Sequence, residues 1–77
     1  MRKYGKLTGK EIRKQFDVMV ESAKKEVDKG KNAYDFAFAI SNEAEEMARE
    51  NMVHLVCIHL VAKRCIDEII EYAAKKN

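Results

Sequence analysis

The sequence predicts an all-α protein, a small bundle of three helices. The chain has no proline and only three glycines in 77 residues; 47% of its residues are hydrophobic and 36% are charged. That balance is typical of helix-rich globular domains and not of disordered chains. Apolar residues also recur at helical spacing in three successive segments, at about 9–29, 33–50 and 52–75. A chain of this length forms one domain at most, so we expect a single helical domain over 1–77.

The first helix is expected to begin after Thr8. Thr8 and Glu11 have the spacing of a capping box, in which each side chain accepts a hydrogen bond from the other residue's backbone amide. One apolar stripe follows, made of Ile12, Phe16, Met19, Val20, Ala23 and Val27. Gly30 stands where a residue in the left-handed conformation commonly ends a helix, which predicts a helix over about 9–29.

The second helix is predicted to begin after Asn32, a favourable N-cap residue, with Asp35 in its first turn where the helix dipole favours an anion. Its apolar stripe is Ala33, Phe36, Ala37, Ile40, Ala44, Met47 and Ala48. Tyr34 and Phe38 lie about 100–140° away from this stripe and share a second face. They either wrap the edge of the core or contact a partner.

Asn51 is the residue at which the second helix is expected to end and the third to begin. In its second half, the third helix has one apolar face, made of Ile66, Ile69, Ile70 and Ala73. Its first half is also apolar on the opposite side, where four residues fall within about 100° of arc. These four residues are Val53, Cys57, Leu60 and Val61. Because three helices cannot surround one of their own number, we expect a partner to cover this face.

The simplest cover for the second face is the same face of another copy, which makes the protein a homodimer paired through its third helix. The predicted partner or dimer interface is Val53, Cys57, Leu60 and Val61, together with Tyr34 and Phe38. Because the sequence contains no recognisable set of catalytic residues, it favours a small non-enzymatic protein-interaction module. We expect it to act as a regulator, adaptor or inhibitor of a larger protein assembly.

Charge is distributed unevenly along the chain. Residues 1–14 carry six bases and one acid, whereas residues 32–51 carry five acids and one base. A short basic N-terminal arm over 1–7 is therefore expected. The bases that could contact phosphates are Arg2, Lys3, Lys6, Lys10, Arg13 and Lys14. A helical dimer that binds nucleic acid through this segment is the alternative function; otherwise the bases are solvated or pair with the acids of the second helix.

Two histidines and two cysteines lie in the apolar third helix: His54, Cys57, His59 and Cys65. On a regular helix His59 points away from the other three, and His54 and Cys65 are separated by about 16 Å of helical rise. One metal ion with ligand bonds near 2 Å cannot collect all four side chains. We therefore expect no metal, no cofactor and, since the cysteines are about 12 Å apart along the helix, no disulfide between them.

Arg49 and His54 are separated by four residues, in RENMVH. This spacing resembles the motif of the HEPN helical ribonucleases, in which paired Arg and His residues at a dimer interface cleave RNA. The resemblance covers these six residues only; Glu50 stands where that family tends to have a polar amide, a histidine or an aspartate, and the chain is shorter than a usual HEPN domain. The second alternative function that the resemblance implies is a metal-independent ribonuclease that uses Arg49 and His54.

The sequence also predicts a cytoplasmic location. Its two cysteines follow no disulfide or metal-binding pattern, which favours a reducing compartment. The longest apolar run, 52–62, is well short of the roughly 20 residues that span a membrane. No apolar segment follows the basic N-terminus as it does in a signal peptide, so we expect no membrane association.

Overall fold

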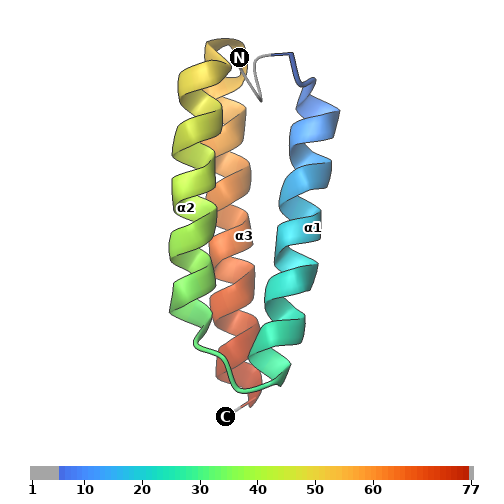
Figure 1. Cartoon of the computed structure of the whole chain (residues 1–77), viewed down its shortest axis with the longest axis vertical. Coiled ribbons are helices and arrows are strands. Elements are labelled where there is room, and N and C mark those ends of the chain that lie inside the picture. Colours follow the sequence, from blue (N-terminus) through green and yellow to red (C-terminus); the bar gives the residue numbers. More distant parts are fainter. Residues whose placement is uncertain (1–5, 77) are drawn as a thin grey trace.

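Three helices form an elongated bundle in the computed structural model, which describes residues 6–76 (Figure 1). The elements in chain order are α1 (Gly9–Asp28), α2 (Ala33–Glu50), a short 3₁₀ turn η1 (Met52–His54) and α3 (Leu55–Lys76). Within those residues there is no strand. The predicted all-α fold with three helices is confirmed; the third helix differs in detail, because its first turn is the 3₁₀ turn η1.

The predicted capping box begins α1. The Thr8 hydroxyl accepts a hydrogen bond from the Glu11 amide at 3.2 Å, and the Thr8 amide donates to Glu11 Oε1 at 2.9 Å. Both hydrogen bonds lower the pKa of the Glu11 carboxyl from its usual value, and the bond to the Thr8 backbone has the larger effect. At the other end Lys29 caps the helix, and Gly30 follows with a φ of 94°, where a side chain would be strained.

Asn51 forms the corner between α2 and α3, and it is buried. Its backbone amide donates to the Met47 carbonyl at 2.8 Å and closes the last turn of α2. Its side-chain amide donates to the Leu7 carbonyl at 3.0 Å. The residue that was predicted to separate the two helices therefore also ties their corner to the segment that precedes α1.

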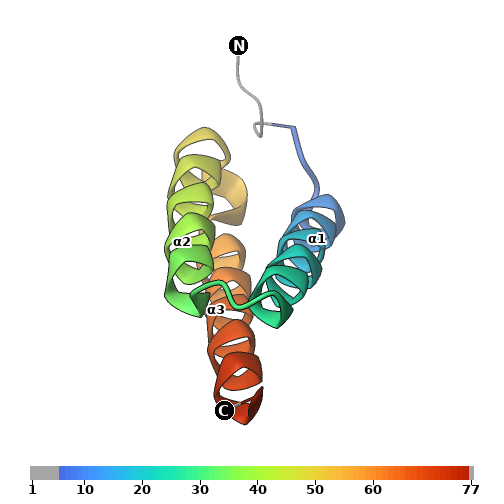
Figure 2. The ribbon, with the colours of Figure 1, turned by 60° about the horizontal axis from the view of Figure 1, so that its bottom comes forward.

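The core lies along α3, which packs against both of the other helices (Figure 2). Direct contact between α1 and α2 is much less extensive. The core cluster is Ile12, Phe16, Val20, Ala23, Ala33, Ile40, Ala44, Met47, Ile58, Ala62, Cys65 and Ile69. Alanines on α2 let that helix approach α3 closely, as the alanine-rich stripe in the sequence predicts.

Polar contacts join the end of α1 to the end of α3. Asp28 accepts a hydrogen bond from the Tyr72 hydroxyl at 2.8 Å and pairs with Lys76 at 2.5 Å. One helical turn away, Lys24 pairs with Glu68 at 2.6 Å. The ammonium groups of Lys24 and Lys76 lie 5.4 and 5.1 Å from the centre of the Tyr72 ring. These contacts fix α1 beside α3 at the end of the bundle away from Asn51.

No helix in the described part of the chain is long and apolar enough to cross a membrane.

Replacing Thr8 with Ala should lower the free energy of unfolding by about 1 kcal/mol, because the substitution leaves an amide at the start of α1 without its acceptor. For a domain of this size, that loss corresponds to a fall of roughly 4–8 °C in melting temperature. Thermal melts followed by circular dichroism measure it. Thr8→Ser keeps the acceptor oxygen and is the control; equal losses in the two variants would show that the hydroxyl bond contributes nothing.

Acid should weaken the contact between α1 and α3 at Asp28. The bonds from Lys76 and then Tyr72 lower the pKa of this carboxyl from its ordinary 3.8. A carboxyl whose pKa is lowered in the folded state stabilises the fold. This stabilisation is complete at a pH above the ordinary pKa, and it is lost as the pH falls through the pKa of the folded state. Wild type should therefore have a higher melting temperature than Asp28→Asn at neutral pH, and the difference should shrink as the pH falls below 3.8. A gap that stays constant with pH would contradict this assignment.

Candidate functional site

The first turns of α3 and the preceding η1 turn expose a row of large apolar side chains. Met52 is 67% exposed, Val53 89%, Val56 69% and Leu60 58%, and Cys57 is exposed among them. We call these five residues the α3 apolar face. Burying one large apolar side chain is worth about 1.5–3 kcal/mol, so a partner that covered this face would gain substantially.

The α3 apolar face is exposed because the opposite side of the helix is used for the core. Ile58, Ala62, Cys65 and Ile69 are the residues through which α3 enters the core. At 100° per residue, Val56, Cys57 and Leu60 lie about 110–170° away from the centre of that side. Neither α1 nor α2 covers them, which is the arrangement expected for the partner-facing side of a helix.

Of the four α3 residues predicted to form an interface, three are exposed and one is half-buried, and the interface itself stays a prediction. Val53, Cys57 and Leu60 are exposed. Val61 is half-buried against the core. The reason is that Val61 shares its side of α3 with Glu68 and Tyr72, which bond to α1, so this side faces α1.

Met52 and Val56 belong to the α3 apolar face but were missed in the sequence. Val56 lies about 140° from the midpoint of Ile58 and Ala62 on a helical wheel, and a wheel centred on those core residues would have found it. Met52 precedes the regular helix, so helical spacing says little about the direction of its side chain.

Tyr34 and Phe38 form a separate apolar spot. They are 63% and 72% exposed, more than residues that wrap the edge of a core would be. Both lie in the first turns of α2, whereas the α3 apolar face begins just past the other end of α2. Since α2 rises about 27 Å over its length, the predicted interface divides into two surfaces.

The four histidine and cysteine residues do not converge. Cys65 is buried in the core, and this burial raises the pKa of its thiol to about 11. Cys57 and His59 are exposed. His54 is half-buried in η1, with its Cε1 atom 4.0 Å from where a Cβ on Gly9 would lie. Over residues 6–76, no three His, Cys, Asp or Glu side chains are grouped so that they could hold a metal ion.

Arg49 and His54 lie on different elements. Arg49 is exposed in the last turn of α2, and His54 lies in η1, with the buried Asn51 between them. The corner at Asn51 therefore separates two residues that would otherwise lie on one continuous helix. Ribonuclease activity stays a prediction.

The basic N-terminal segment is described in part. Lys6, Lys10, Arg13 and Lys14 are all exposed, and the last three share the outer side of α1. Arg2 and Lys3 lie outside the described residues. Nucleic-acid binding also stays a prediction.

No protein-family model, curated protein sequence or solved structure matches this chain. Its function therefore has to be argued from its own surfaces.

The Cys65 thiol should react slowly with Ellman's reagent, because it is buried and its raised pKa leaves little thiolate near neutral pH. The variant to measure is Cys57→Ser, in which Cys65 is the remaining cysteine. Its reaction should be complete within minutes in denaturant and at least about a hundredfold slower in buffer. Rapid reaction of the folded variant would show that the core opens at Cys65.

Proposed function

We propose that this protein is a small non-enzymatic interaction module that forms a homodimer through the α3 apolar face and acts by binding another protein. The observation that supports the proposal is the exposed row of Val53, Val56 and Leu60 on a helix whose other side fills the core. Such a module is suited to a role as a regulator, adaptor or inhibitor of a larger assembly. Such a module acts by binding its partner, and this role requires no catalytic group.

Self-association is the simplest way to cover the α3 apolar face. In a two-fold dimer one patch serves both partners, so no second complementary surface is needed. A domain of 77 residues has a free energy of unfolding of only roughly 5 kcal/mol. Covering several large apolar side chains in each copy would add to that stability, and it would couple folding to association.

Charges farther along α3 favour one geometry for the dimer. Arg64, Asp67 and Glu71 continue the same outer side of the helix toward its C-terminus, and all are exposed. Antiparallel pairing centred near Cys57 sets the apolar turns of the two copies against each other and leaves these charged turns in solvent. It also brings the two Cys57 thiols close to the two-fold axis.

The protein should have twice its 8.9 kDa monomer mass when measured by light scattering after size exclusion at micromolar concentration. Leu60→Glu places a charge in the paired face and should convert the dimer to monomer, since a buried unpaired carboxylate is strongly unfavourable. Mild oxidation should cross-link wild type through Cys57 and leave Cys57→Ser uncross-linked.

Val18→Glu is the matched control for Leu60→Glu. Val18 is 61% exposed and Leu60 58%, but Val18 lies on α1, away from the α3 apolar face. This variant should remain dimeric. A wild-type species of 8.9 kDa that is fully helical and unfolds cooperatively would refute the proposed dimer.

A further inference from the structure

The outer side of α2 carries two aromatic side chains that the rest of the described chain leaves mostly exposed. Tyr34 is 63% exposed and Phe38 72%, and neither packs into the core. On a regular helix they point about 90° and 130° away from the centre of the core side of α2. Aromatic rings exposed to this extent add little to the stability of their own chain, and a partner that covered them would gain a large apolar contact.

Three carboxylates lie on the same side of the helix as the two rings. Asp35, Glu45 and Glu46 fall with the rings inside an arc of about 120°, and all three are exposed. None of the three forms an ion pair with another described residue. We call this surface the α2 outer face; its residues are Tyr34, Asp35, Phe38, Asn42, Glu45 and Glu46.

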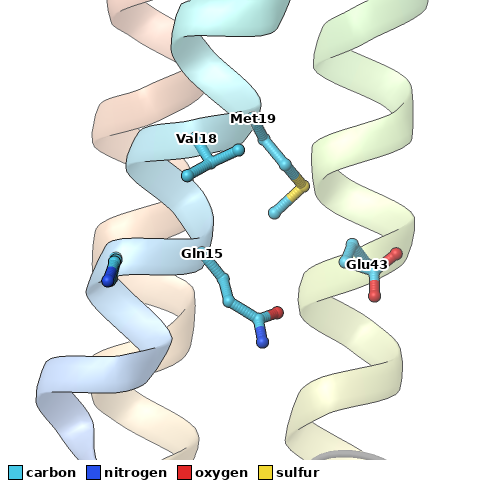
Figure 3. A pocket seen from close by; sticks show the side chains of 5 residues that line it. Gln15, Val18, Met19 and Glu43 are labelled. Carbon is cyan, nitrogen blue, oxygen red and sulfur yellow. The ribbon is translucent and has the colours of Figure 1, made fainter.

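Glu43 lies on a different side of α2. Figure 3 shows it across from Gln15 and Met19 of α1, at the hollow between these two helices. Charges of both signs line that hollow, because Lys14 and Glu43 both border it. The α2 outer face is separate from the hollow, and its charged residues are all acidic.

The helix itself accounts for one of the three acids on the α2 outer face. Asp35 lies in the first turn of α2, where the helix dipole favours an anion. Glu45 and Glu46 lie in the second half of the helix, where the dipole does not favour them. Glu46 is also three residues from Glu43, so two like charges are neighbours on the helix. Charges that disfavour their own helix are expected where they serve a contact outside the chain.

Bases border the α2 outer face but do not lie within it. Lys31 precedes the helix, and Arg49 follows Glu45 by one turn. Lys63 of α3 borders a hollow together with Glu45, and its ammonium group lies 4.0 Å from Asp67, so part of its charge is balanced within α3. The face therefore presents aromatic rings and negative charge along about 18 Å of helix.

We propose that the α2 outer face binds a basic, arginine-containing segment of another protein. A guanidinium ion stacks on aromatic rings and forms paired hydrogen bonds with carboxylates, and this face offers both groups. Asp35 and Glu45 are separated by about 15 Å of helical rise, with Phe38 between them. Arginines at that spacing would reach both acids while their aliphatic stems cover the ring. This inference rests on the proposed role as an interaction module, for which it names the class of partner, and it does not depend on the dimer.

The basic start of the same chain can reach only part of this face. Residues 1–7 carry three bases and no acid, and the Leu7 carbonyl is bonded to Asn51, just past the end of α2. Asp35 lies about 24 Å of helical rise from Asn51. Six fully extended residues span at most roughly 20–22 Å. A basic segment that covers both ends of the face therefore comes from another molecule.

The test uses three synthetic peptides of about 12 residues, which match the 18 Å length of the face when they are helical. One has four arginines separated by alanines, one has lysines and one has glutamates at the same positions. Fluorescence anisotropy with full-length protein at low salt should give a Kd for the arginine peptide about threefold or more below that of the lysine peptide. The glutamate peptide should not bind, and high salt should weaken the binding of both basic peptides.

Protein variants locate the site. Glu45→Gln and Glu46→Gln together should weaken binding of the arginine peptide about tenfold, and Phe38→Ala should weaken it about fivefold. The matched controls are Glu21→Gln and Val18→Ala, which change an exposed acid and an exposed apolar residue on α1. Both controls should leave the Kd within about twofold of the wild-type value. Circular dichroism shows that each variant is folded.

Three outcomes would overturn the inference. The first is no binding of the arginine peptide at millimolar protein. The second is equal weakening by Glu21→Gln and by the paired glutamine variant, which would show that net charge alone drives binding. The third is a variant lacking residues 1–5 that binds the arginine peptide tenfold or more tightly than the full chain, which would show that the chain's own basic start occupies the face.

These failures are distinguishable from failure of the proposed dimer. A dimeric wild-type protein that ignores the arginine peptide would overturn the inference and leave the interaction module standing. A monomeric wild-type protein that binds the peptide, and loses it in Phe38→Ala, would refute the dimer and support the inference.

Discussion

A bundle of three helices can bury only one side of each helix, and the exposed surfaces of this protein follow from that limit. α3 lies against both other helices, and its Ile58 and Ile69 side chains are fully buried with Phe16 of α1 and Met47 of α2. The side of α3 opposite this core has no helix to cover it within the described part of the chain. A second consequence is that α1 and α2, both committed to α3, make little contact with each other and leave a groove between them.

Asn51 determines which residues occupy these surfaces. It ends α2 with its backbone and, through its side chain, bonds to the Leu7 carbonyl, so the corner is held against the start of α1. The 3₁₀ turn that follows sets the rotation at which α3 begins. With that rotation Ile58 enters the core, whereas Val56 and Leu60 point away from it. One buried polar side chain thus couples the position of the α2–α3 corner to the exposure of the α3 apolar face.

The sequence correctly predicted the features that depend on one residue and its own helical turn. Thr8, Glu11, Asn32 and Gly30 act on their own turns, and each performs the role expected of it. Periodicity also showed that α3 is apolar on two sides. It could not show which neighbour would cover each side, because that depends on how helices pack. The packing of Val61 against the core was therefore not visible in the sequence. An isolated valine on a polar side of α1, Val18, gave no periodic signal at all, and the groove it lines exists only through the arrangement of α1 and α2.

The exposed surface of α3 and the hollow between α1 and α2 differ in how much their chemistry says about a partner. The α3 apolar face carries no charge of its own, so its copy fits it as well as any other apolar surface does. The hollow between α1 and α2 has charges of both signs on its α1 side, where Lys14 lies beside Asp17 and Glu21, so charge does not select a partner for it.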